Sequence, residues 1–487
     1  MSNTAISEGP QASALKASVW KAFSSSLRAN VLAEIGVQTL RVSGTIVLAR
    51  ILHPSDFGIY KALFVVATIA ILFTEGGLPD ALIQRKEISP AHEATAWWLS
   101  LGLVSVISGS LYFVAPYIAS AMRMPALTFD IRLLCIPILL EGLSSIPNAR
   151  LRRKLKFSDL ALADVFAEIT FLAVALALIA GNYARYSLAG GLAARYGVHA
   201  VTVWSRDTYI PKSLPSIAAA RDLTRFSVTA MAASLAITCA SNADYILVGR
   251  LLGSEALGIY TIAWDVLKFV SARVHRIATR VLFPAFSRLQ DHDDELSRAY
   301  VRLLGLLARI VLPITLMAVV AAPEMVTGIY GPQWIAAAMP VRLLALGMAL
   351  FGLREGIGTI YYAKGHPAID IYLNGGRFLL IIVIVAGLSR FGLPAVAAGV
   401  SVLEGFVGVI GITIASRLIH LNIWRLLVNS MPKVAYLMVL FLPVMILAKL
   451  LVLHLGASGP QALVIIVIPT GLAFLMVNRP LLRQIIS

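Results

Sequence analysis

The sequence predicts an all-α polytopic membrane protein with about fourteen transmembrane helices. The first observation is composition: of 487 residues, 59% are apolar and only 14% are charged, whereas a soluble domain is roughly half apolar and a quarter charged. The second is that many apolar runs approach the ~20 residues that an α-helix needs to cross a bilayer. The third is an internal repeat that divides the chain into two similar parts.

The apolar runs place the expected spans along the whole chain. Gly, Pro and ionisable residues interrupt several spans, which are therefore expected to face other helices or water rather than lipid. Residues 1–28 begin with a polar stretch, so we expect no cleaved signal peptide. Apolar residues then recur at helical spacing beside basic ones, which predicts a cytoplasmic segment with an interfacial amphipathic helix. The spans are expected near 29–52, 58–79, 94–121, 126–148, 158–180, 186–204, 222–250, 256–286, 300–323, 337–362, 368–388, 392–418, 431–455 and 459–478.

The segment Arg50–Tyr60 returns two hundred positions later, without a gap, as Arg250–Tyr260. Arg, Leu, Gly, Ile and Tyr recur at the same offsets. A second match, Arg132-Leu133-Leu134 with Arg342-Leu343-Leu344, has nearly the same offset, so we infer a duplicated unit. Spans one to six form a first lobe and spans seven to twelve a second, and six spans per lobe make the repeats parallel. The predicted domains are 1–28, 29–205, a cytoplasmic linker at 206–221, 222–418, and an unpaired C-terminal pair of spans at 419–487.

Lys and Arg residues gather in every second loop. The cluster from Arg150 to Lys156 and the linker 206–221 fall on the crowded side, whereas the opposite loops hold few basic residues. The positive-inside rule therefore predicts that both termini are cytoplasmic. The same bias accounts for the formal net charge of +16, so we expect no nucleic-acid partner.

Several motifs are similar to those of a known family. The first copy of the repeated segment and stretches in both lobes resemble the Wzx-type polysaccharide flippases of the multidrug/oligosaccharidyl-lipid/polysaccharide (MOP) superfamily. The residues that carry the resemblance are Arg50-x-Leu52-x-Pro54-x-Asp56-Phe57-Gly58, Ala81-Leu82-Ile83-Gln84-Arg85, Phe283-Pro284-Ala285-Phe286-Ser287-Arg288 and Gly331-Pro332-Gln333-Trp334.

The resemblance implies two pseudo-symmetric six-helix bundles around a central cavity, followed by two C-terminal helices. It implies a flippase of the bacterial inner membrane that turns undecaprenyl-pyrophosphate-linked oligosaccharide repeat units to the outer leaflet by alternating access, for exopolysaccharide or lipopolysaccharide biosynthesis. Membrane lipid, a polysaccharide polymerase and a chain-length regulator are the further partners it suggests. Such a protein needs a polar, net-basic cavity inside an apolar shell.

The first span has the clearest polar face. Glu34, Gln38 and Arg41 recur every three or four residues and share one side of a helix. A Glu or an Arg in mid-membrane costs about 2.5–3.5 kcal/mol on insertion scales, so a pure packing role is disfavoured. We predict that these residues line the cavity. The alternative is that Glu34 serves only as the partner of Arg41.

Other spans contribute further candidates. Lys268, Arg354 and Arg377 are predicted with Arg41 to contact anionic groups, and Asn374 lies one turn before Arg377. Asp164 and Glu168 are four positions apart on span five and are a candidate proton or sodium site, because their charges repel. The alternatives for this pair are a place in the cytoplasmic vestibule or a salt bridge to Arg195. The remaining ion-coupling candidates are Asp244, Asp265 and Asp370.

Two alternatives have a different chemistry. A membrane polymerase or ligase of the same pathway usually has a large outer loop with Arg and His, but the longest outer loop here, Pro323 to Ile335, has no basic residue. A MATE-like cation-coupled drug antiporter would share the fold but not the quoted motifs. The sequence has no His-Glu-x-x-His, paired Cys or Gly-rich loop with Lys, so we expect no metal, no cofactor and no enzymatic activity.

Overall fold

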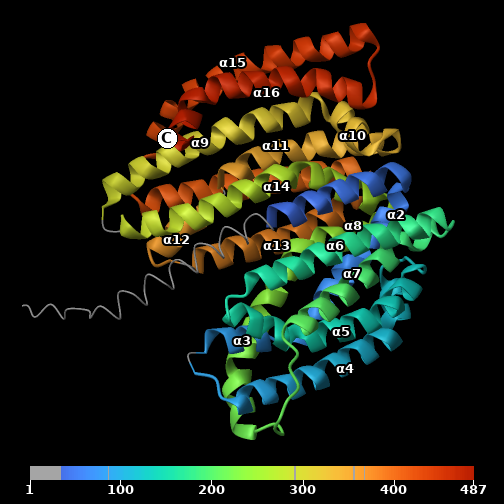
Figure 1. Ribbon diagram of the computed structural model, residues 1–487. Coiled ribbons are helices and arrows are strands. Elements are labelled where there is room, and N and C mark those ends of the chain that lie inside the picture. Colours follow the sequence, from blue (N-terminus) through green and yellow to red (C-terminus); the bar gives the residue numbers. More distant parts are fainter. Residues whose placement is uncertain (1–33, 86, 290–291, 355–356, 367, 487) are drawn as a thin grey trace, which may run out of the picture. The chain divides into compact units, whose positions relative to one another are not determined.

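A computed structural model describes residues 34–85, 87–289, 292–354, 357–366 and 368–486 (Figure 1). Across these ranges all regular elements are helices, which confirms the all-α prediction. The interfacial helix expected within residues 1–28 lies outside the described residues. The helices are one over 34–51, α2 (Pro54–Glu75), α3 (Leu78–Gln84), α4 (Pro90–Ala121), α5 (Leu127–Arg153), α6 (Phe157–Ala180), α7 (Ala184–Arg206), α8 (Ile217–Arg288), α9 (Asp293–Val320), α10 (Ala322–Tyr330), η1 (Pro332–Ala337), α11 (Ala338–Arg354), α12 (Gly358–Ala363), α13 (Ala368–Leu388), η2 (Ser389–Phe391), α14 (Leu393–Leu418), α15 (Ile423–Leu455) and α16 (Gly459–Ile486).

Ten helical stretches in the described ranges are long and apolar enough to cross a membrane. Other expected spans coincide with the helix over 34–51 and with α5 and α7. Two expected spans fall within α8, where Gly253 has a non-helical backbone (φ 90, ψ 177) between them. The protein is therefore a polytopic helical membrane protein, and the number fourteen stays a prediction.

The chain forms two compact units. The N-terminal unit contains the chain up to Leu48 and Ala62–Cys239, and the C-terminal unit contains Ala49–Lys61 and the chain from Ala240 onward. The first copy of the repeated segment thus belongs with the second unit. The domain boundaries expected from the sequence remain a prediction.

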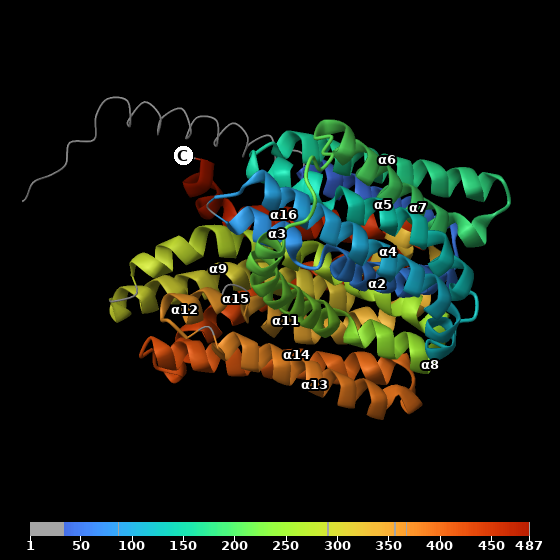
Figure 2. The ribbon, with the colours of Figure 1, turned by 90° about the horizontal axis from the view of Figure 1, so that it is seen from below.

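The two units repeat one packing pattern. In the N-terminal unit α4 packs on α5, α5 on α7, and α6 on α7. In the C-terminal unit α9 packs on α11, α11 on α14, and α13 on α14, which are the same pairs in repeat order (Figures 1 and 2). The matched arginines Arg132 and Arg342 lie on the corresponding helices α5 and α11. This correspondence supports the duplication inferred from the sequence.

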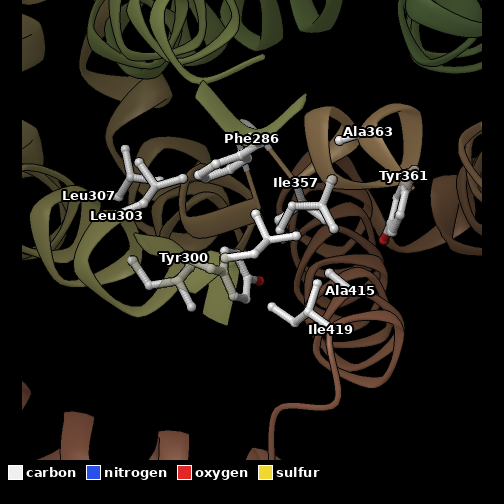
Figure 3. Close-up of a cluster of buried hydrophobic side chains, with 12 residues drawn as sticks. Phe286, Tyr300, Leu303, Leu307, Ile357, Tyr361, Ala363, Ala415 and Ile419 are labelled. Carbon is white, nitrogen blue, oxygen red and sulfur yellow. The ribbon is translucent and has the colours of Figure 1, made fainter. Parts of the chain in front are cut away.

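The last two helices pack on the rest of the C-terminal unit. α15 contacts α9, and α16 contacts α10. The Lys449 ammonium of α15 pairs with Glu324 of α10 at 2.9 Å and donates to the Val320 carbonyl at 3.1 Å. An apolar core closes one end of this unit, where residues of α8, α9, α12 and α14 meet (Figure 3). Its buried side chains include Phe286, Tyr300, Leu303, Leu307, Ile357, Tyr361, Ala363, Ala415 and Ile419.

The two copies of the repeated segment cross each other. A Cβ atom on Gly58 would lie 1.7 Å from the Ser254 carbonyl oxygen, and one on Gly258 would lie 1.8 Å from the Pro54 carbonyl oxygen. Gly58 corresponds to Gly258, and Pro54 to Ser254, so the contact is reciprocal. The absence of a side chain on both glycines lets the backbones approach this closely.

Two of the sequence motifs quoted above, the one that begins at Arg50 and the one at Gly331–Trp334, meet next to this crossing; the Phe57 and Trp334 rings lie 5.2 Å apart. The Ala49 carbonyl accepts hydrogen bonds from Gln333 Nε2 at 2.8 Å and from Trp334 Nε1 at 2.7 Å. Arg50 donates to the carbonyl oxygens of Ile329, at 2.9 Å, and Gly328. These contacts explain why residues 49–61 belong with the C-terminal unit although they lie within the first repeat.

The basic cluster at the end of α5 is largely paired within the N-terminal unit. Arg150 contacts Glu93 and donates to Asp207 at 2.7 Å, and Lys154 donates to Asp207 at 2.8 Å. Arg153 donates to the Leu82 carbonyl at 2.9 Å. Burial raises the pKa of Asp207, but the hydrogen bonds from Arg150 and Lys154 outweigh burial and hold that pKa below its usual range. The cluster therefore joins α4, α5 and the segment after α7.

Replacing Gly258 by Ala is expected to destabilise the protein. The added methyl group would overlap the Pro54 carbonyl, and the backbone shift that relieves such overlap costs about 1–3 kcal/mol or more. The thermal unfolding midpoint of the detergent-solubilised protein measures the effect. Gly109→Ala is the matched control, because a Cβ on that helical glycine has nothing within 4 Å. An unchanged midpoint in Gly258→Ala would contradict the crossing.

Replacing Asp207 by Asn is expected to lower the free energy of unfolding by about 1–2 kcal/mol, allowing for the screening of half-exposed Lys154. An unfolded Asp has a pKa of about 3.9, and the folded-state value is lower. The stabilisation is therefore complete above about pH 4 and is lost as pH falls through the folded-state pKa. The difference in stability between wild type and Asp207→Asn should be constant from pH 8 to 5. No difference in stability, or a wild type that gains stability relative to Asp207→Asn as pH falls from 8 to 5, would mean that the ion pair does not form.

Candidate functional site

Three charged side chains meet inside the N-terminal unit. Arg41, on the helix over 34–51, donates to Glu168 Oε1 of α6 through Nε at 2.9 Å and through an Nη at 2.6 Å. Arg195 of α7 reaches the same oxygen at 3.0 Å. The group therefore contains two cations and one anion, contributed by three helices.

Exposure differs sharply among these three residues. The Glu168 side chain is 3% exposed and that of Arg195 is 19% exposed, whereas that of Arg41 is 43% exposed. A buried carboxylate is costly without a partner, and here it has two guanidinium partners. The more exposed guanidinium, Arg41, is the part of the group that a ligand can reach.

A second contact extends this polar layer. His199, one turn after Arg195 on α7, lies 2.9 Å from Glu141 and 3.8 Å from Asp164, which is one turn before Glu168 on α6. α6 and α7 thus face each other with an acidic pair on one helix and a basic pair on the other. The Glu75 carboxylate, at the end of α2, interacts electrostatically with Glu141.

The sequence predicted part of this arrangement. Arg41, Asp164 and Glu168 were candidates, and the salt bridge between Glu168 and Arg195, one of the stated alternatives, is confirmed. The roles of His199, Glu141 and Glu75 were missed. Arg195 and His199 are four residues apart, as are Asp164 and Glu168. This matching spacing could have predicted that the two basic residues face the two acidic ones.

The C-terminal unit contains a corresponding pair with the charges exchanged. Arg377 of α13 donates to Glu404 Oε1 of α14 through Nε at 2.8 Å and through an Nη at 2.5 Å. The side chains are 19% and 2% exposed. The two residues are 27 positions apart, as are Glu168 and Arg195. In one unit the carboxylate precedes the guanidinium, and in the other it follows.

Asp244 adds a third charge to the second pair. It lies on α8, which corresponds to the helix over 34–51, and is 5% exposed. Its carboxylate accepts a hydrogen bond from the Tyr260 hydroxyl at 3.0 Å, and its charge acts on Arg377. This group therefore contains two anions and one cation, the reverse of the first.

The remaining candidates are placed as follows. Glu34 is exposed and Gln38 is half-buried on the helix over 34–51, and the partner found for Arg41 is Glu168. Asn374 donates to the Asp370 carbonyl at 2.9 Å within α13, and Asp370 is half-buried. Asp265 of α8 is exposed. The side chains of Lys268 and Arg354 lie outside the described part of the structure.

The chemistry of the first group suits the binding of an anion. Over the described ranges, no three His, Cys, Asp or Glu side chains form a group that could hold a metal ion. The first group offers a guanidinium to an anionic ligand, and such charge-assisted bonds are among the stronger hydrogen bonds in proteins. An apolar bundle that exposes such a guanidinium fits an anionic, amphipathic ligand.

The chain is similar in sequence to proteins of polysaccharide biosynthesis. The chain is 26% identical over 318 residues to the teichuronic acid biosynthesis protein TuaB of Bacillus subtilis. This alignment covers 65% of this chain and 65% of TuaB, which is slightly less than two thirds of each. The chain is 24% identical over 496 residues to the succinoglycan biosynthesis transport protein ExoT of Rhizobium meliloti, covering 94% of each.

The fold is similar to a solved structure of the lipid II flippase MurJ, with a TM-score of 0.72 and 13% identity, over 94% of this chain and 99% of MurJ. At that identity the similarity establishes the fold alone. The sequence model of the polysaccharide biosynthesis protein family matches residues 47–339, which is more than half of the chain and extends across both repeats. This protein belongs to the polysaccharide biosynthesis protein family.

Proposed function

We propose that this protein is a flippase that moves undecaprenyl-pyrophosphate-linked oligosaccharide repeat units across the bacterial inner membrane. The glycan units serve exopolysaccharide or lipopolysaccharide biosynthesis, and the protein works by alternating access without catalysing a covalent reaction. The observation that carries the proposal is an exposed guanidinium in a group with an excess of cations, inside a helical fold that matches a flippase over nearly its whole length.

The relatives favour a lipid-linked glycan as the substrate. TuaB is named for teichuronic acid biosynthesis, and ExoT is named as a succinoglycan biosynthesis transport protein. MurJ is named as a lipid II flippase. A common feature of such substrates is a pyrophosphate between the lipid and the sugar, and this group needs positive charge on its way through the membrane.

Arg41 is the residue that we propose for the pyrophosphate or for acidic groups of the glycan. Lys268 and Arg354 remain further candidates for the same contact, and Gln38 and Asn374 for the sugar. Arg377 ranks below Arg41 because its side chain is 19% exposed, whereas that of Arg41 is 43% exposed.

For coupling to an ion, Asp164 is our preferred candidate. It lies within reach of His199, whose other ring nitrogen contacts Glu141, so one proton can be shared among three side chains. Glu168, Asp244, Asp265 and Asp370 remain candidates of lower rank, since the first two are already engaged in charged contacts.

Deleting the gene is expected to abolish the surface polysaccharide and to leave complete lipid-linked repeat units on the cytoplasmic side. Mass spectrometry of extracted lipid-linked glycans, with a membrane-impermeant label for outer-leaflet sugars, measures both quantities. Arg41→Gln at normal protein level should reproduce the deletion. Gly109→Ala should behave as wild type.

A different result would identify another component of the pathway. If single repeat units reach the outer leaflet in the deletion strain and fail only to polymerise, the protein acts in polymerisation or ligation rather than in flipping. If no glycan changes and a cationic drug accumulates instead, the protein is a drug antiporter.

We propose that both termini face the cytoplasm, as the distribution of basic residues indicates. Green fluorescent protein fused after Ser487 is expected to fluoresce, and alkaline phosphatase fused at the same position is expected to be inactive. The opposite pair of results would reverse the orientation.

A further inference from the structure

Both units contain an ion pair at corresponding positions, but the third charged residue beside the pair differs between them. α6 and α7 contain Glu168 and Arg195, and α13 and α14 contain Arg377 and Glu404, with equal separation and nearly equal burial. In the first unit an additional cation, Arg41, reaches the same carboxylate oxygen. In the second, the additional residue is an anion, Asp244, whose charge acts on Arg377.

This difference decides which arginine can leave its carboxylate. If Arg41 turns away, Glu168 keeps Arg195 at 3.0 Å, and no buried charge is left without a partner. If Arg377 turns away, Glu404 loses the only cation that the described residues place on it. Its Oε2 atom already has no hydrogen-bond partner there. Stranding a buried carboxylate is strongly unfavourable, so Arg377 is held and Arg41 is exchangeable.

We propose that Glu168 and Arg195 are positioning residues for Arg41. In the empty protein Glu168 holds the Arg41 guanidinium on the polar face of its helix. When an anionic pyrophosphate arrives, Arg41 transfers its hydrogen bonds from Glu168 to the phosphate oxygens, and Arg195 alone neutralises Glu168. The inference rests on the proposed function, because it takes the pyrophosphate of the lipid-linked substrate as the competing anion.

The mechanism predicts opposite effects from the two positioning residues. Glu168→Gln removes the anion that competes for Arg41, so a pyrophosphate should bind more tightly. Arg195→Gln leaves Glu168 dependent on Arg41, so a pyrophosphate should bind more weakly. Because a charge-assisted hydrogen bond is worth a factor of ten or more, each change should be about tenfold. Residues that only support the fold would weaken binding in both variants.

The test uses the full-length protein in detergent and inorganic pyrophosphate as the titrant, with heat release as the signal. Arg41→Gln should abolish binding, and Arg195→Lys should retain it. The double variant with both Glu168→Gln and Arg195→Gln should bind about as tightly as Glu168→Gln alone, because no carboxylate then holds Arg41. This double variant and Arg195→Gln keep the test decisive if Glu168→Gln alone fails to fold.

The results distinguish a failure of the proposed function from a failure of the positioning role alone. If Arg41→Gln binds pyrophosphate normally, the anion site of the proposed function is wrong. If Arg41→Gln loses binding while the two positioning variants change affinity in the same direction, the proposed function stands and the positioning role is wrong. Short-chain phosphatidylglycerol is the comparator: if it displaces pyrophosphate at equal concentration, the site takes lipid headgroups in general, which overturns the proposal.

Discussion

A carboxylate buried between two antiparallel helices constrains much of each unit. Glu168 and Glu404 are almost inaccessible, and each requires a guanidinium from a neighbouring helix. Removing one partner of a buried pair costs about 3–5 kcal/mol, which is a large part of the stability of any domain. The pairing therefore fixes how α6 lies on α7 and how α13 lies on α14. It also places Arg41, which reaches the same carboxylate from a third helix.

Duplication explains both the similarity of the two units and their difference. The same pairs of helices pack in each unit, and the two copies of the repeated segment cross at Gly58 and Gly258. The acidic and the basic residue of an ion pair can exchange places without loss of attraction, as they do between the first unit and the second. The third charged residue, Arg41 in the first group and Asp244 in the second, then leaves an excess of cations in the first group and of anions in the second. Two units of one origin can thus perform different electrostatic tasks.

The sequence predicted the fold class and the repeat, because apolar length and a gapless match of eleven positions are local properties of the chain. It also selected Arg41, Asp164 and Glu168, since charges within apolar runs are conspicuous. It could not choose the partner of Arg41: Glu34 shares a helical face with it, whereas Glu168 is 127 positions away. His199 was overlooked because its partners, Glu141 and Asp164, lie on two other helices and become neighbours only through helix packing.

The proposed function requires that this single chain move a lipid-linked glycan between leaflets. The most direct test is reconstitution of the purified protein into liposomes with an undecaprenyl-pyrophosphate-linked oligosaccharide distributed over both leaflets, followed by an impermeant reagent that modifies the sugars exposed on the outside. If the protein is a flippase, wild-type protein will make nearly all of the substrate accessible over time, with its pyrophosphate intact, whereas Arg41→Gln will leave about half protected, as in protein-free liposomes. Equal accessibility with and without the protein, or cleavage of the pyrophosphate, would contradict it.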